Sequence, residues 1–210
     1  MRAISRPGTQ GLLSRAAGRV AKRKGEITAG SPTGPPCRRI GRNELATIDA
    51  CRALADAQAE YFAGLHDGAT RHQYALKFIS DPGKQNGLCW KSAEGQPASP
   101  LGPLAAHATS EGYSIKADAH TAFHGYYFRM LTGQSKQAQG GAKDYVMNGK
   151  MVGGFAFVAY PAKYGDSGIM TFIDNQDRVL LQKDLGTTTT ETASAMKVFD
   201  PDTGWSPVEQ

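Results

Sequence analysis

The order of two hydrophobic periods along the chain is the feature that most constrains its fold. In residues 41–64, apolar residues recur at steps of three and four, which is the period of an amphipathic helix. From residue 124 onward, aromatic-rich runs alternate in hydrophobicity and are separated by glycine-containing turns. Helices first and strands later, without βαβ alternation, predict an α+β fold with N-terminal amphipathic helices packed on a C-terminal antiparallel sheet.

The helices are expected at four places. The first follows Asn43, a good N-cap residue, and continues for about twenty residues. A short second helix is expected over residues 71–79, where two aromatic residues stand four apart. A third is expected over residues 99–112, with Pro100 at its first position, and a last one near residues 190–198.

Four strands are expected in the second half of the chain. Their sequences are GYYFRMLT, FAFVAYP, GIMTFID and RVLLQKDL. The polar NQDR segment at residues 175–178 is typical of a hairpin tip, and Asn148-Gly149 is a strong tight-turn signal. The sheet is therefore expected to be antiparallel, with a small additional hairpin at residue 148.

Charge is distributed unevenly along the 210 residues, whose formal net charge is +5. Residues 1–40 hold nine Lys and Arg against one acid, and the remainder holds 15 bases and 18 acids. A net charge of minus three over residues 41–210 argues against a nucleic-acid-binding domain, because such domains need a basic surface. Specific nucleic-acid binding is not expected, and contact through the basic leader ranks third among the functional hypotheses.

The leader, residues 1–38, is rich in Gly, Pro, Ser and basic residues and lacks sustained apolar periodicity. Such a segment is expected to be disordered, because it buries too little apolar surface to offset the entropy of ordering. It contains no apolar stretch typical of a secretory signal, and the chain contains no apolar run long enough for a transmembrane segment. Either a targeting segment or a non-native, truncated or mis-framed start explains it, and residues 39–210 are expected to form one domain.

Several long strings make the chain recognisable: HGYYFRMLTGQ, GGAKDYVMNGKMVGGFAFVAYPAKYGDSGIMTFIDNQDRVLLQKDLG and FDPDTGWSPV. Together with RRIGRNELATIDACRALADAQAEY and SPLGPLAAHATSEGY, they resemble the bacterial domain-of-unknown-function family 2950 over residues 38–210. The resemblance implies an exported, periplasmic or lipid-anchored protein of uncharacterised activity. The first helix and the strands are also similar, in topology, to the helix and the antiparallel head of a pilin or pseudopilin.

Candidate functional residues lie mainly in these strings. Cys37, Cys51 and Cys89 form no CxxC pair, so neither a metal site nor a disulfide framework is indicated, and no motif indicates a cofactor. Aromatic and polar residues of the strands and turns are the candidates for binding a partner: His124, Tyr126, Tyr127, Asp144, Tyr145, Asn148 and Tyr160.

Two classes of function follow from these residues. The favoured one is a non-catalytic cell-envelope protein that binds a protein, peptide or glycan partner, with no residue assigned a catalytic role. The alternative is a hydrolase-like enzyme in which His124, Asp144 and Tyr126 meet in a cleft. His124 precedes Gly125 and a strand, a place where a polar side chain often ties a loop down, which favours a structural or ligand-contacting role.

Overall fold

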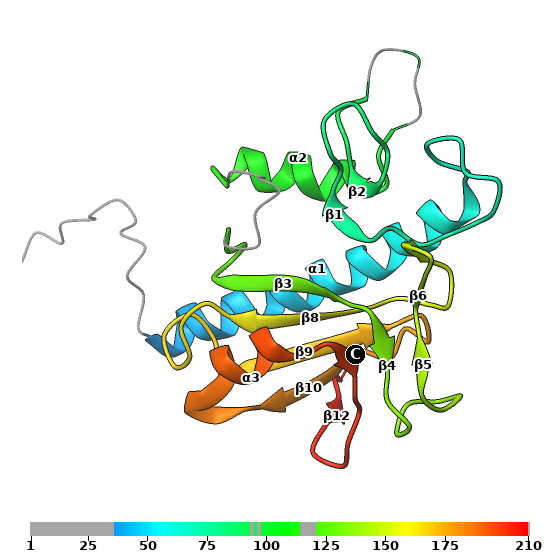
Figure 1. The fold of residues 1–210 in the computed structure, drawn as a ribbon. Coiled ribbons are helices and arrows are strands. Elements are labelled where there is room, and N and C mark those ends of the chain that lie inside the picture. The colour runs from blue at the N-terminus through cyan, green and yellow to red at the C-terminus, as the bar shows by residue number, and fades with distance from the viewer. Residues whose placement is uncertain (1–35, 93–94, 96–97, 114–120, 210) are drawn as a thin grey trace, which may run out of the picture. The chain divides into compact units, whose positions relative to one another are not determined.

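The first element of the described chain is one long helix. The structure is a computed structural model that describes residues 36–92, 95, 98–113 and 121–209 (Figure 1). In it, α1 (Pro36–Ala63) contains 28 residues. Buried side chains larger than alanine recur in it at steps of three and four: Thr47, Cys51, Leu54, Gln58 and Tyr61. A helix with one buried stripe, as predicted, is therefore confirmed.

The start of α1 differs from the prediction, because Asn43 lies inside the helix rather than at its N-cap. The amide of Asn43 donates to the carbonyl oxygen of Ser167 at 2.8 Å. In the next residue, Glu44, the side-chain Oε1 accepts hydrogen bonds from the backbone N–H groups of Ile169 and Met170, at 2.9 and 3.0 Å. These contacts with a distant loop hold the early turns of the helix, so no cap is needed at residue 43.

Five strands form the main sheet, in the order β12-β10-β9-β8-β3, and every neighbouring pair is antiparallel. They are β3 (Tyr126–Leu131), β8 (Ala156–Pro161), β9 (Met170–Asn175), β10 (Leu181–Asp184) and β12 (Ser206–Pro207). The first four coincide with the four predicted runs, and the predicted tip at residues 175–178 joins β9 to β10. The α+β class is confirmed.

Helices cover both faces of the main sheet. Arg129 and Met130 are neighbours on β3, so their side chains point to opposite faces. The Met130 sulfur lies 3.8 Å from Nε2 of Gln58 in α1, whereas the Arg129 guanidinium donates to the carbonyl oxygen of Ala193 at 3.0 Å. Ala193 belongs to α3 (Thr189–Ala195), so α1 and α3 lie on opposite faces (Figure 1).

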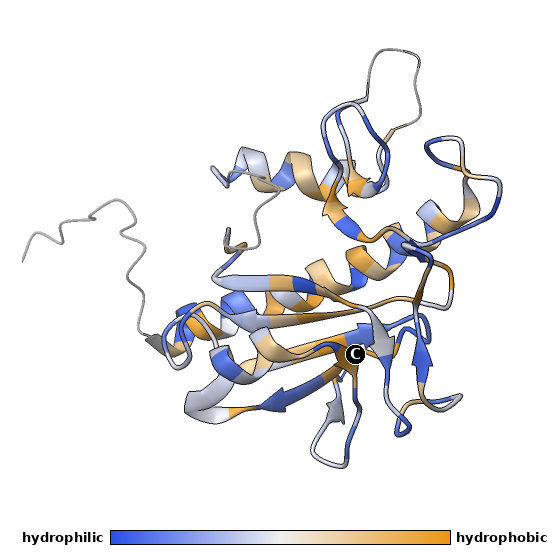
Figure 2. Cartoon of the chain, in the orientation of Figure 1, coloured by the Kyte–Doolittle hydropathy of each residue, from blue (hydrophilic) through white to orange (hydrophobic). Residues whose placement is uncertain are grey.

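The most buried part of the core lies on β8 and β9, which are largely hydrophobic in Figure 2. Two neighbouring large side chains on each of these strands have no exposed surface: Phe157 and Val158 on β8, and Phe172 and Ile173 on β9. Packing is tight enough to exclude side chains nearby. A Cβ atom added to Gly168 would lie 2.1 Å from the hydroxyl oxygen of Tyr126, so only glycine fits beside this ring.

Short strands and a 3₁₀ turn complete the fold around the main sheet. They are β1 (Lys77–Ile79), β2 (Gly87–Cys89), β4 (Gly133–Gln134), β5 (Lys143–Asp144), β6 (Val146–Met147), β7 (Lys150–Met151), η1 (Gly186–Thr188) and β11 (Val198–Phe199). β6 and β7 form the predicted hairpin, because Asn148 and Gly149 both adopt positive φ, at 51° and 73°.

The helix predicted over residues 71–79 is wrong. This segment is extended, and its last three residues form β1 parallel to β2. The buried amide of Gln58 donates to the carbonyl oxygen of Ala75 and accepts from its N–H, each at 2.9 Å. Tyr74 also donates its N–H to Met151 at 2.8 Å. These backbone groups are therefore bonded to other segments and cannot form a helical ladder.

The third predicted helix is present but shorter than expected. α2 (Gly102–Ser110) begins after Leu101, with Pro103 in its first turn, so Pro100 stands outside it. The N–H of Leu101 donates to the carbonyl oxygen of Leu88 at 2.9 Å, which joins the start of α2 to β2. That long-range bond places the helix start two residues later than the proline signal indicated.

Candidate functional site

β3 is the end strand of the main sheet, and its register shows which backbone groups face outward. In an antiparallel pair, hydrogen-bonded and non-bonded residue pairs alternate. Because the N–H of Ala162 donates to the carbonyl oxygen of Gly125 at 2.8 Å, every second residue from Tyr127 onward is bonded to β8. The residues between them point their N–H and C=O groups away from the sheet: Tyr126, Phe128 and Met130.

Two of these three residues have unpaired backbone groups. Tyr126 exchanges two hydrogen bonds with Phe123, each 2.9 Å long, and beyond the strand both backbone groups of Thr132 are also bonded. Within the described part of the chain, nothing bonds the outward N–H and C=O of Phe128 or Met130. We call these four groups the β3 edge.

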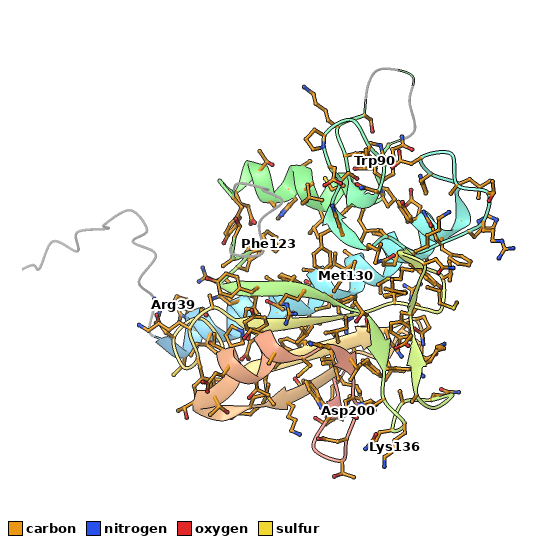
Figure 3. The ribbon with its side chains drawn as sticks, viewed as in Figure 1. Arg39, Trp90, Phe123, Met130, Lys136 and Asp200 are labelled. Carbon is orange, nitrogen blue, oxygen red and sulfur yellow. The ribbon has the colours of Figure 1, made fainter. Side chains whose placement is uncertain are left out.

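The side chains beside the β3 edge form two different surfaces. On the α1 face, the half-buried Phe128 ring meets Phe78 edge-on at 6.5 Å between centroids, and Met130 lies beside α1 (Figure 3). On the α3 face, Tyr127 and Tyr160 of β8 lie opposite each other with ring centroids 5.7 Å apart. One surface is therefore apolar, and the other presents the half-buried Tyr127, packed on the buried Tyr160, and the neighbouring Arg129.

His124 stands at the entry to β3 and connects it to the end of α2. Its Nε2 lies 3.0 Å from Oε2 of Glu111, and its Nδ1 lies 3.4 Å from the hydroxyl of Tyr113. The imidazole also packs edge-on against Phe123, with centroids 4.3 Å apart. His124 has φ of 46°, which is uncommon for a residue other than glycine and shows that these contacts hold it in place.

Tyr126 is buried and cannot take part in surface binding. Its hydroxyl donates to the carbonyl oxygen of Met170 at 3.0 Å. Burial, and to a smaller extent the carboxylate of Glu44, raises the pKa of Tyr126 far above its ordinary value. The phenol is therefore neutral at physiological pH and anchors β3 to β9.

The remaining candidates lie beyond the other end of β3. Asp144 is exposed on β5, opposite Gly133. Tyr145 has no exposed surface, and its hydroxyl donates to Gln134 Oε1 at 2.7 Å. Asn148 is exposed in the turn between β6 and β7. His124, Tyr126, Tyr127 and Tyr160 therefore lie together around the first half of β3, but only His124 and Tyr127 among these four are partly exposed.

The three residues of the hydrolase alternative do not meet. His124 precedes β3, whereas Asp144 pairs with Gly133 beyond its far end, and the six residues of β3 alone span roughly 20 Å. Tyr126 is sealed in the core between them. His124 instead has Glu111 as its acidic neighbour, and no serine, threonine or cysteine side chain is hydrogen-bonded to it within the described residues.

The described residues contain neither a cluster of metal ligands nor a helix suited to a membrane. No group of three or more His, Cys, Asp or Glu side chains is arranged to hold a metal ion in this part of the chain. Among the helices that the structure describes, none combines the length and the apolar character needed to cross a bilayer.

Local sequence patterns do not indicate most of the residues of this site. Glu111 lies at the end of the helix expected over residues 99–112 and Tyr113 just beyond it, while Phe128 and Met130 lie in an expected strand. Nothing local marks a strand as the last one in a sheet, because edge position depends on which strands pair. The one available signal was His-Gly after Phe123, since His tolerates positive φ better than most residues.

Comparison with known proteins identifies the family of the chain. No curated protein and no solved structure matches it, so the likeness to a pilin head stays a prediction. A family model described as protein of unknown function (DUF2950) matches residues 32–208, which covers the main sheet, all three α-helices and the β3 edge. The chain is a member of this family of unknown function, as its motifs indicated.

Proposed function

We propose that this protein is a non-catalytic binding protein of the bacterial cell envelope, which takes an extended peptide segment of a partner as a sixth strand beside β3. The observation that carries the proposal is the pair of unbonded residues, Phe128 and Met130, at the end of an antiparallel sheet. Placement in the cell envelope rests on the resemblance to exported proteins of the family.

The backbone chemistry of the β3 edge suits an extended peptide. Strand addition at an exposed edge obtains affinity from main-chain hydrogen bonds and specificity from alternate side chains. The α1 face offers Phe128, Phe78 and Met130 to apolar side chains of the peptide. On the α3 face, Tyr127 and Arg129 favour aromatic or acidic side chains. The partner segment is thus one that alternates apolar with acidic or aromatic residues.

A second copy of this chain fits the β3 edge less well. In an antiparallel pair of two copies, one register bonds all the free backbone groups. It places Phe128 of each copy opposite Met130 of the other. Arg129 would then lie directly opposite Arg129 of the other copy, in a non-bonded pair whose side chains approach closely. Like charges placed opposite each other destabilise a strand pair, so a partner of different sequence is favoured.

The test uses the full chain and a displayed library of random twelve-residue peptides. Peptides selected on the wild-type protein should lose at least about tenfold in affinity for Met130→Pro, because proline removes one outward N–H. Met130→Leu is the matched control, since it changes the side chain but keeps the N–H. Both variants should keep the circular dichroism spectrum of the wild type, because the lost N–H is not bonded within the protein.

Hydrogen exchange decides whether a selected peptide binds as a strand. The amides of Phe128 and Met130 should become protected on binding, whereas those of Tyr127 and Arg129 are already bonded to β8 and should change little. Failure to select any peptide, or binding that leaves the first two amides unprotected, contradicts the proposal. A dimer that Met130→Pro dissociates would instead identify a second copy as the occupant.

A further inference from the structure

A second region, separate from the β3 edge, has the form of a small-molecule site. A cavity of about 610 Å³ lies between the β1–β2 pair, the turn after β1 and one side of α2. This volume falls within the usual range for sites that bind small organic ligands, about 300–1,000 Å³. Its apolar lining comes from three elements: Ile79, Cys89, Trp90, Ala105 and Ala106.

The charged groups that line the cavity have a net positive charge. Lys84 and Lys91 are exposed at the cavity, and neither forms an ion pair with another described residue. Among the described residues of the lining, the one acid, Asp81, is already engaged, because Lys77 Nζ lies 2.7 Å from its Oδ1 and Asn86 donates to its Oδ2 at 2.8 Å. The Lys77 hydrogen bond lowers the pKa of Asp81, so this carboxylate stays ionised and paired.

Cys89 and Trp90, which line the cavity between the two lysines and α2, are uncharged. Burial raises the pKa of the Cys89 thiol, so the sulfur is uncharged at neutral pH. The indole Nε1 of Trp90 is buried and has no acceptor among the described residues, although its ring packs near Tyr61 and His66. This nitrogen has almost no accessible surface, so it offers no contact to a ligand in the cavity, and Trp90 contributes to the lining through its ring.

From the apolar lining, which includes the Trp90 ring, and the two ammonium groups of Lys84 and Lys91, we infer that this cavity binds an amphipathic organic anion. The ligand class is a carboxylate or sulfonate with an aliphatic or aromatic body. Its body packs on Trp90 and the α2 alanines, and its anionic group lies between Lys84 and Lys91. This site does not depend on strand addition at the β3 edge, which lies on a different element.

Trp90 provides the signal for the test. The chain contains two tryptophans, so Trp205→Phe leaves Trp90 as the only one. Titrating decanoate below its micellar concentration should change Trp90 fluorescence in a saturable way, whereas decyltrimethylammonium, of equal chain length and opposite charge, should not. Lys84→Gln combined with Lys91→Gln should raise the Kd for decanoate about tenfold.

The matched control removes the same charge elsewhere. Lys136 and Lys197 are exposed, and Lys136 lies far from Trp90 in Figure 3. Lys136→Gln combined with Lys197→Gln should leave the Kd for decanoate within about twofold of that of the Trp205→Phe protein. Equal binding of the cation, an equal loss in both double variants, or no saturable signal with decanoate would each overturn the inference.

Discussion

The sheet region around β8 and the peripheral region of α2, β1 and β2 differ in how much of each element is buried. All six residues of β8 are buried between α1 and α3. In the peripheral region, α2 buries only Ala108, and β1 has one exposed and two half-buried residues. The sheet region is therefore expected to supply most of the free energy of unfolding. The proposed ligand cavity lies in the peripheral region, whereas the β3 edge lies at the margin of the main sheet.

The largest effect should come from truncating a core side chain of the sheet region, and a matched truncation in the peripheral region should cost much less. Phe157→Ala should lower the free energy of unfolding by about 3–5 kcal/mol, because it removes a ring with no exposed surface. Leu104→Ala, in α2, should cost about 1 kcal/mol, since Leu104 is only partly buried and alanine favours helix. Urea unfolding measures both, and equal costs would break the distinction between the two regions.

A smaller effect should come from an ionisable group inside the sheet region. Asp174 on β9 is 2% exposed, and burial raises its pKa to about 7, although the bonded N–H of Asn175 acts in the opposite direction. In the unfolded chain this carboxyl ionises near pH 4. Between about pH 4 and 7 the unfolded state therefore releases a proton that the folded state keeps, and the folded state loses stability as pH rises.

Asp174→Asn removes this pH dependence. The variant should match the wild type at about pH 4 and exceed it by on the order of 3 kcal/mol at about pH 8, because the amide cannot ionise. Thermal and urea unfolding at the two pH values check this, with the acidic condition as the internal control. A constant difference across the whole range would show that Asp174 is hydrated and that the sheet region is less closed than described.

The smallest effect should arise where the two regions join, at His124. His124→Ala should lower the free energy of unfolding by about 1–2 kcal/mol, because the contacts with Glu111 and Tyr113 are lost. Hydrogen exchange should become faster in α2 and stay unchanged in β8. Glu111→Ala should cost about as much, and the double variant little more, since both remove the same contact.

The outcome for His124 also bears on the choice between the two functional classes. A hydrolase activity that is present in the wild type and lost in a normally folded His124→Ala protein would contradict the non-catalytic proposal. Binding of selected peptides that survives this substitution would show that the β3 edge works without the α2 contact.

Periodicity predicted the elements best where burial and local pattern agree. The buried stripe of α1 and the β8 and β9 strands follow from apolar spacing, because each buries one face or nearly all of its residues. The Asn148-Gly149 turn follows from the backbone freedom of those two residues. The helix expected over residues 71–79 failed because the buried Gln58 side chain bonds both backbone groups of Ala75.

The sequence by itself determined the α+β class, the main helices and strands, and membership in a family of unknown function, because these depend on local patterns and motifs. Only the tertiary structure decided that β3 is an end strand, that His124 meets Glu111 rather than Asp144, and that Lys84 and Lys91 share a cavity with Trp90. The physical reason is that strand order and side-chain meetings across the fold depend on long-range packing, which no local pattern encodes.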